Sequence, residues 1–94
     1  MLRYLVCFDI PDDTTRKETS DVLESYGIRV QRSVFEVVCK SRSEFRKLQL
    51  DLLSIIDQEA DSVRFYPQCE SCAAKAFDLG NFPDPFDREA IYFF

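Results

Sequence analysis

The chain has 94 residues, a formal net charge of −5 and no histidine, which fits one domain whose core is small enough to favour oligomerisation. The acidic total argues against a non-specific nucleic-acid coat, although nine basic and eight acidic residues precede Leu48, and three basic and nine acidic residues follow Lys47. Because no apolar stretch approaches the roughly 18 residues of a membrane span and no basic-then-apolar leader opens the chain, we expect a cytoplasmic protein without membrane contacts.

The first predicted element is a buried strand over residues 2–8, which is short, apolar and bounded by Pro11. It runs directly into Asp9, a lone carboxylate at the end of an apolar run. Asp favours turns because its side chain bonds the backbone just ahead, and Pro11 discourages the strand from continuing. Asp9 is therefore either a turn-former or a metal and acid–base ligand at the edge of a sheet.

A first helix is predicted from Thr15 to Tyr26, with Thr14 or Asp13 as its cap. For Asp12 and Asp13 together, we favour helix capping and a favourable interaction with the helix dipole in the first turn. Gly27 follows as the expected helix terminator, because glycine tolerates a positive φ. The chain then enters a second β segment.

This segment, from Ile28 to Cys39, has strand propensity, and residues 31–33 interrupt it with a bulge or a turn. Ser41 or Ser43 caps a second helix. Its apolar residues recur at helical spacing, and they are Phe45, Leu48, Leu52, Ile55 and Ile56.

A further strand is predicted over residues 63–66, stopped by Pro67, and a short one over residues 74–77, closed by Gly80. If the second segment splits in two, the order is βαββαβ, the α+β ferredoxin-like fold. We place this domain at residues 1–80. Its four-stranded antiparallel sheet carries both helices on one face, so the apolar side chains of the other face need a partner, most simply a homodimer pressed sheet to sheet.

Cys69 and Cys72 form a Cys-x-x-Cys motif. A redox motif of this kind usually opens a helix after a strand, and Pro67 and Glu70 around it argue against that placement. Two copies could build a four-thiolate zinc site across a dimer axis. We favour the third interpretation, a turn with two thiols near it.

The C-terminal tail, residues 81–94, contains two prolines and ends in an apolar run. An exposed apolar end strand would promote aggregation, so we expect a short strand that pairs with an edge of its own sheet or of the partner's. Ile91 and Phe93 are the predicted interface residues. Acids in the tail also suit a basic groove on another protein, and a tail folded back on its own domain is the alternative.

Three segments together resemble a known family: residues 4–12 (YLVCFDIPD), 26–36 (YGIRVQRSVFE) and 61–67 (DSVRFYP). In this order and spacing they resemble the CRISPR-associated Cas2 family, the small protein of the spacer-acquisition module. The string from Gly27 to Glu36 is the specific part, and the three segments bracket about two thirds of the chain.

The resemblance implies the ferredoxin-like fold, a tight homodimer, and a bridge between two dimers of the integrase Cas1 in a complex that captures and inserts DNA. Several members are described as magnesium-dependent endonucleases on single-stranded RNA or on DNA. By that resemblance, Asp9 would meet its symmetry mate across the dimer and hold the metal. Arg16, Arg29 and Phe35 would occupy functionally important positions.

Two departures from the family pattern weaken the nuclease interpretation and leave the adaptor interpretation intact. Phe8 stands where the family often has Tyr, so a hydroxyl beside the acid is missing. Glu18 and Thr19 follow Arg16 and Lys17 where further basic residues are frequent.

The chemistry of the residues agrees with the resemblance without requiring catalysis. Mg²⁺ takes oxygen ligands, often one or two carboxylates with water and phosphate, and Asp9 from each of two chains meets that minimum. One acid per chain, with no evident general base, supplies few of the groups that catalysis needs. Three hypotheses therefore stay open: a DNA-binding adaptor, a magnesium-dependent endonuclease, and a ferredoxin-like interaction module.

The predicted nucleic-acid contacts are basic residues near the two ends of the first helix. Arg16 and Lys17 either touch phosphate or lie on a solvated helix face. Arg29 and Arg32 either contact the phosphate backbone or form surface ion pairs. Phe35 belongs to the core or to the dimer interface, and we assign it to the interface.

Overall fold

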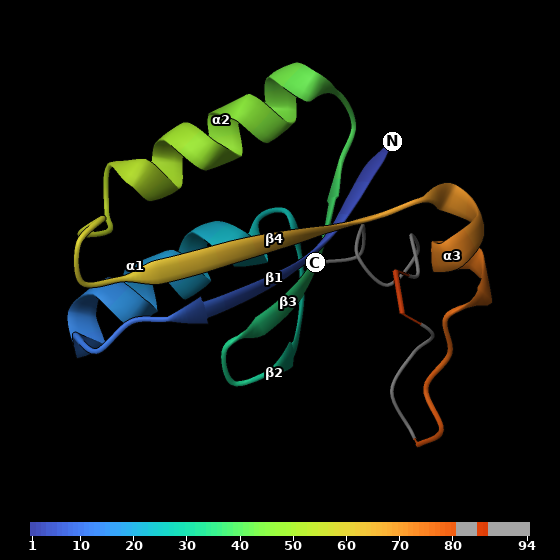
Figure 1. Ribbon diagram of the computed structural model, residues 1–94, viewed down its shortest axis with the longest axis horizontal. Helices are drawn as coiled ribbons and strands as arrows, with labels where there is room; N and C mark the ends of the chain where they lie inside the picture. Colours follow the sequence, from blue (N-terminus) through green and yellow to red (C-terminus); the bar gives the residue numbers. More distant parts are fainter. Residues whose placement is uncertain (81–84, 87–94) are drawn as a thin grey trace.

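The computed structural model describes residues 1–80 and 85–86 of the chain. It consists of one sheet with two long helices behind it and a short third helix at one end (Figure 1). The elements in chain order are β1 (Leu2–Asp9), α1 (Asp13–Glu24), β2 (Gly27–Gln31), β3 (Val34–Cys39), α2 (Arg42–Leu53), β4 (Ser62–Gln68) and α3 (Glu70–Lys75).

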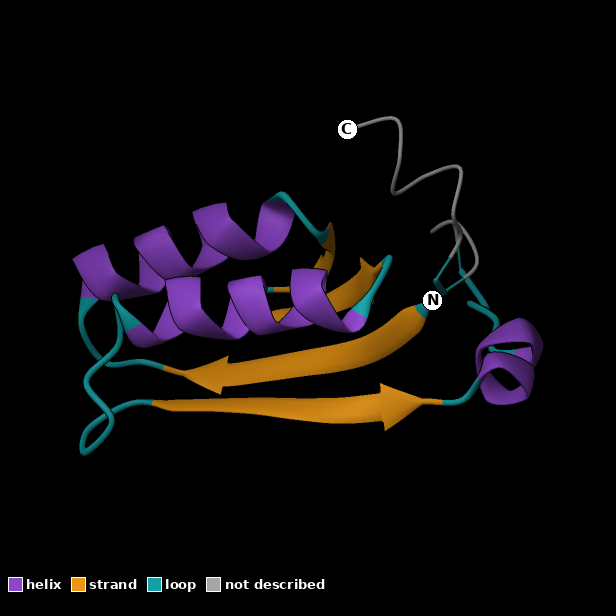
Figure 2. Cartoon of the chain, turned by 90° about the horizontal axis from the view of Figure 1, so that it is seen from above, coloured by secondary structure: helices purple, strands orange, loops and turns teal. Residues whose placement is uncertain are grey.

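The sheet has the order β2-β3-β1-β4, and every neighbouring pair is antiparallel. Both α1 and α2 lie on the same face of this sheet (Figure 2). The predicted βαββαβ order, the four-stranded antiparallel sheet and the ferredoxin-like α+β class are therefore confirmed. The predicted break in the second β segment is a turn at residues 32–33, together with a register shift between Arg29 and Gln31.

The core forms where alternate side chains of the strands meet the apolar stripes of the two helices. β-branched and aromatic residues suit this half-buried surface, and successive side chains of a strand point to opposite faces. The buried cluster comprises Val6, Phe8, Ile10, Leu23, Phe35, Val37, Cys39, Leu48 and Leu52. Phe35, at 0% exposure, is the largest of its fully buried side chains.

Three aromatic rings fix α2 onto the sheet. Tyr4 of β1 stacks on Phe45 of α2, with ring centroids 4.3 Å apart. Phe65 of β4 meets both rings edge-on, at 5.9 Å and 5.6 Å. Offset and edge-to-face pairs of this kind add to the burial energy of the rings. The three rings therefore hold α2 against β1 and β4.

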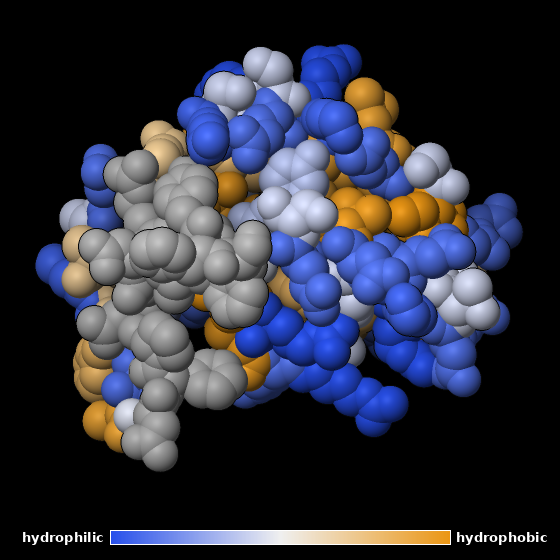
Figure 3. Space-filling view, turned by 180° about the vertical axis from the view of Figure 1, so that it is seen from behind, coloured by the Kyte–Doolittle hydropathy of each residue, from blue (hydrophilic) through white to orange (hydrophobic). Residues whose placement is uncertain are grey.

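The opposite face of the sheet carries the strand side chains that alternate with the core residues. In β1 these positions are Leu5, Cys7 and Asp9, and in β4 they include Tyr66, which is 44% exposed. Neither α1 nor α2 covers this face (Figure 2). We call it the open face. The helix side, by contrast, presents a largely hydrophilic surface with smaller apolar areas between (Figure 3).

Gly27 has a different role from the predicted one. No glycine in residues 1–80 or 85–86 has a positive φ, and Gly27 opens β2 rather than closing α1, which ends at Glu24. A Cβ at Gly27 would lie 1.9 Å from the carbonyl oxygen of Glu36. Glycine is needed there because the backbones of β2 and β3 approach too closely for a side chain.

The two long helices differ slightly from their predicted ends. α1 begins two residues earlier than predicted, because Asp12 is its cap in place of Asp13 or Thr14. Ser41, one of the two predicted caps, begins α2 and accepts a hydrogen bond from the Glu44 N–H at 3.2 Å. α2 ends at Leu53, so the predicted apolar residues 55 and 56 lie in the turn beyond it.

The segment after Tyr66 corrects two predictions. β4 continues through Pro67 to Gln68, which an edge strand permits because one side of its backbone needs no partner. The predicted strand over residues 74–77 is wrong, since residues 70–75 form α3. The Cys-x-x-Cys motif therefore opens a helix directly after a strand, the placement that the sequence argued against.

Most of the C-terminal tail, including the predicted edge-pairing strand with Ile91 and Phe93, lies outside the described residues. Phe86, which is described, has a φ of 59°, and its N–H donates a hydrogen bond of 3.2 Å to Oε1 of Glu36. Among the described helices, none combines the length and the apolar character that a membrane-spanning segment requires.

Candidate functional site

Asp9 is the last residue of β1 and lies opposite Ser62, the first residue of β4. Phe8 before it and Ile10 after it are buried in the core at 5% and 3% exposure. The alternation of the strand therefore directs the Asp9 carboxylate to the open face, where it is exposed. It makes no hydrogen bond or ion pair with any residue in the described part of the chain.

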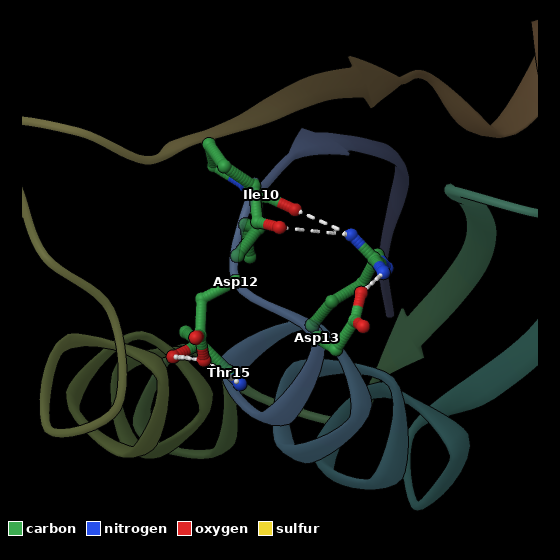
Figure 4. Close-up of polar contacts among 6 residues, drawn as sticks. Ile10, Asp12, Asp13 and Thr15 are labelled. Carbon is green, nitrogen blue, oxygen red and sulfur yellow. Dashed lines mark hydrogen bonds and ion pairs between the residues drawn. The ribbon is translucent and has the colours of Figure 1, made fainter.

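The turn after β1 is formed by Asp12 rather than by Asp9. Oδ2 of Asp12 accepts hydrogen bonds from the Thr15 N–H at 2.8 Å and from the Thr15 hydroxyl at 2.9 Å (Figure 4). These bonds favour the charged carboxylate and lower the pKa of Asp12. The side chain of Asp9 is thus not used for turn formation, and its other interpretation, as a ligand, stays a prediction.

Arg16 holds the chain that follows Asp9. Its Nη1 donates to the carbonyl oxygens of Ile10, at 2.9 Å, and Pro11, at 3.4 Å, while Nη2 pairs with Asp13 (Figure 4). These contacts tie the end of β1 to the first turn of α1. Arg16 therefore positions the Asp9 strand end in addition to any contact that it makes with phosphate.

The four predicted nucleic-acid residues come together in one hollow of about 330 Å³. They belong to α1, to β2 and to the turn between β2 and β3. The hollow is lined by Arg16, Lys17, Arg29, Arg32, Ser20, Asp13, Asp21 and Glu24. We call it the basic hollow, since four cations face three carboxylates there.

The cations of the basic hollow differ in how they are held. Lys17 pairs with Asp21 at 2.9 Å, which raises the pKa of Lys17. Arg29 lies over the ring of Phe35, 5.4 Å from its centroid, an arrangement that attracts a cation to the ring face. Arg32 is exposed in the turn after β2 and pairs with no acid among the described residues, so it is the cation with the fewest constraints.

The donor type of Asp9 fits a magnesium ion, whereas the number of donors in one chain does not complete a site. An exposed carboxylate without an internal partner is an oxygen ligand of the kind that Mg²⁺ prefers. Within residues 1–80 and 85–86, no three His, Cys, Asp or Glu residues gather in a metal-binding group. A metal on Asp9 would therefore need a ligand from a second chain or from a bound phosphate.

The structure also bears on two other sequence-based assignments. The side chain of Phe35 is fully buried, which supports the core alternative over the interface assignment. Position 8 faces the core, so a tyrosine hydroxyl there would point away from the Asp9 carboxylate. The presence of Phe8 in place of the tyrosine that is frequent in the family is consequently weaker evidence against catalysis at Asp9.

The favoured interpretation of Asp12, helix capping, is confirmed by its two hydrogen bonds from Thr15. Sequence reasoning missed one residue of this region, Glu36. Glu36 is buried on the open face, and burial raises its pKa. Its alternation with Phe35 and Val37 predicts the face, but the Phe86 contact that helps to bury it comes from 50 residues later, and no local pattern encodes that contact.

Comparison with known proteins gives a consistent result. Residues 1–76 match the family model described as CRISPR associated protein Cas2. A Synechocystis protein named CRISPR-associated endoribonuclease Cas2 3 is 52% identical over 67 residues, which are 71% of this chain and 72% of that protein. A Rhodospirillum rubrum protein named CRISPR-associated endoribonuclease Cas2 4 is 42% identical over 80 residues, which are 85% of this chain and 64% of that protein.

A solved structure shares the fold. A chain of a partial Cas6-RT-Cas1–Cas2 complex superposes with a TM-score of 0.72 at 39% sequence identity, covering 84% of this chain and 85% of that chain. The family match spans β1 to β4, and these elements carry Asp9 and the basic hollow.

Proposed function

The chain belongs to the CRISPR-associated Cas2 family, and we propose that it acts as a homodimeric adaptor that holds DNA and joins Cas1 dimers during spacer acquisition. The observation that carries the proposal is the basic hollow, where side chains far apart in the sequence line one cavity. The similarity to a chain of a complex that contains Cas1 supports Cas1 as the partner.

The basic hollow suits the sugar–phosphate backbone better than it suits bases. Its charged groups lie on α1, on β2 and in the turn after β2, and none of the described residues that line it is aromatic. Lysine and arginine contacts with phosphate position a duplex without reading its sequence. Lys17 would exchange Asp21 for a phosphate, and Arg32 would bind without losing an ion pair.

The open face supports the homodimer. Apolar side chains of β1 and β3 on this face, Leu5 and Val34, are only half-buried in a single chain, and a second sheet would remove them from water. In an isologous contact the same patch of each copy is used, and a residue meets its own symmetry mate only where the two-fold axis passes beside it. An axis beside Asp9, at one end of this face, would make its symmetry mate the second carboxylate.

DNA binding tests the hollow directly. Affinity for DNA falls as salt rises, and each lost phosphate contact makes the slope of log affinity against log salt shallower by about 1. We expect this shallower slope in both Lys17→Ala and Arg32→Ala, measured on a short duplex across a salt series. Arg42→Ala is the matched control, because Arg42 is an exposed arginine on α2 that lines a different hollow. Equal slopes in the Arg32→Ala protein and the unmodified protein would contradict the proposal.

Spacer integration tests the adaptor role. In a reconstituted reaction with Cas1, we expect Asp9→Ala to retain integration, because an adaptor needs surfaces rather than the carboxylate. Loss of integration in Asp9→Ala, with the dimer and the Cas1 complex intact by sedimentation, would refute the purely structural version.

A second candidate function, a magnesium-dependent endonuclease on RNA or DNA, is favoured by the exposed and unpartnered Asp9 carboxylate. Asp9 from two chains would hold the metal, which supplies an activated hydroxide and neutralises charge on the phosphate. The Arg16 contacts with the Ile10 and Pro11 carbonyls would keep the two carboxylates in register.

Metal binding and cleavage separate this candidate from the adaptor. We expect Mn²⁺, used as a spectroscopic probe for Mg²⁺, to bind one ion per dimer, with binding lost in both Asp9→Ala and Asp9→Asn. Cleavage of single-stranded RNA and of DNA should be lost in the same two variants. Activity that persists in purified Asp9→Ala would identify a contaminating nuclease and remove the candidate.

A further inference from the structure

The Cys-x-x-Cys motif has no part in the proposed function. Cys69 is the residue between β4 and α3, and Cys72 lies in the first turn of α3. Both side chains are exposed free thiols, whereas Cys39 is buried in the core. The motif stands at the Gln68 end of β4, and Asp9 lies beside the Ser62 end, so the two sites occupy opposite ends of one strand.

The geometry of the motif brings its two residues into bonding range. The N–H of Cys72 donates a hydrogen bond of 3.4 Å to Sγ of Cys69, and the Ser71 hydroxyl lies 3.5 Å from the same sulfur. The rise and radius of an α-helix place the Cα atoms of residues three apart about 5 Å from each other, and a disulfide spans Cα separations of about 4.4–6.8 Å. A bond between the two sulfurs therefore needs side-chain rotation and little movement of the backbone.

The two thiols also differ in ionisation. Hydrogen bonds from Ser71 and Cys72 lower the pKa of Cys69 to about 7, and the adjoining Cys69 sulfur raises the pKa of Cys72. Burial raises the pKa of Cys39 to about 11. At neutral pH, the Cys69 thiol is consequently ionised more readily than the Cys72 thiol, so Cys69 is the first nucleophile and Cys72 the second.

We propose that Cys69 and Cys72 form a reversible thiol–disulfide pair whose co-substrate is the disulfide of a small thiol. The Cys69 thiolate attacks one sulfur of that disulfide, which forms a mixed disulfide and releases the first small thiolate. Cys72 then loses its proton to solvent and attacks the Cys69 sulfur, which releases the second small thiolate. The two protein thiols are oxidised to one disulfide, and the small disulfide is reduced to two thiols, which take up two protons at neutral pH.

Oxidised glutathione is the probe for this reaction. The full chain is mixed with oxidised and reduced glutathione at pH 7, quenched with acid, alkylated and weighed by intact mass spectrometry. We expect a product that lacks two hydrogen atoms and maps to a Cys69–Cys72 bond. Because thiolate fraction and access set the rate, Cys69 should react about 100-fold faster than Cys39 in the same chain.

Single substitutions separate the two steps. Cys72→Ser should stop at the mixed disulfide and accumulate glutathione on Cys69, while Cys69→Ser should abolish the fast reaction. Cys39→Ala is the matched control and should leave both the rate and the product unchanged. Circular dichroism of each variant verifies that the fold is retained.

Two results would overturn the proposal. The first is accumulation of the mixed disulfide in the unmodified chain to the same extent as in Cys72→Ser, which would mean that Cys72 does not resolve it. The second is a disulfide that joins two chains or involves Cys7 or Cys39. Neither result bears on the adaptor proposal, since Asp9 lies beside the other end of β4 and the basic hollow is formed by α1, β2 and the turn after β2.

Discussion

The two faces of the sheet are made by the same strands and differ in what covers them. On the helix side, α1 and α2 bury alternate strand residues into the core. On the open face, the intervening residues of β1 and β4 are half-buried or exposed, and Asp9 lies among them without a partner in the described part of the chain. The helix side therefore holds the single chain together and carries the basic hollow, and the open face is available to a second copy and a metal. The following variants test that division, beginning with the largest expected loss.

Phe35→Ala is expected to lower the free energy of unfolding by about 4 kcal/mol, because it removes a fully buried aromatic ring and leaves a cavity. Urea unfolding measures this loss. Phe77→Ala is the matched control, since Phe77 is 68% exposed, and it should change stability by less than about 0.5 kcal/mol. A small loss in Phe35→Ala, accompanied by dissociation of the dimer, would instead favour the interface assignment of Phe35.

Gly27→Ala is expected to lower the free energy of unfolding by about 3 kcal/mol, since the new Cβ would overlap the Glu36 carbonyl and force β2 away from β3. Gly80→Ala is its control, because a Cβ there would meet a side-chain atom, Oδ1 of Asp78 at 3.1 Å, and no backbone carbonyl. Chemical denaturation compares the two. Equal effects at both positions would show that the close approach of β2 and β3 does not demand glycine.

Tyr66→Asp is expected to leave the single chain nearly as stable as before, within about 0.5 kcal/mol, because Tyr66 is 44% exposed. It should nevertheless shift the protein towards monomer, since a charge on the open face would be buried without a partner in a sheet-to-sheet dimer. Sedimentation across a concentration series measures this shift. Leu50→Asp, at a 57% exposed position on α2, is the control and should leave the dimer intact. Dissociation by Leu50→Asp alone would place the contact on the helix side.

Glu36→Gln is expected to have the smallest effect and to stabilise the chain at pH 7. Burial raises the pKa of Glu36 from its usual 4.5, so the stability linked to its proton is present below that value and is lost as pH rises through the folded-state pKa. Glutamine carries no charge at any pH and keeps an oxygen that can accept the Phe86 N–H. Thermal unfolding at pH 4 and pH 7 should show a gain for the variant at pH 7 that shrinks at pH 4. The reverse trend would mean that the charged carboxylate stabilises the open face.

Local sequence patterns predicted a large part of the fold, and the predictions that were wrong share a cause. The alternation in β1 and β3, the turn at residues 32–33 and the Ser41 cap all depend on neighbours within a few residues, and each was predicted or stood among the predicted alternatives. The strand predicted over residues 74–77 was wrong, because alternation over four residues does not distinguish a strand from the turn of a short helix. The continuation of β4 through Pro67 depends on its place at the sheet edge, which topology decides.

The sequence by itself determined the βαββαβ order up to β4, the ferredoxin-like class and the family, and it predicted four basic residues as nucleic-acid contacts, because periodicity, capping and short motifs are local properties of a chain. Tertiary structure decided which of these residues meet. It gathered the basic residues into one hollow, left the Asp9 carboxylate unpartnered on the open face, and gave Gly27 a role in strand approach in place of helix termination. These outcomes depend on distances between segments remote in sequence, and such distances are set when the sheet pairs and the helices pack.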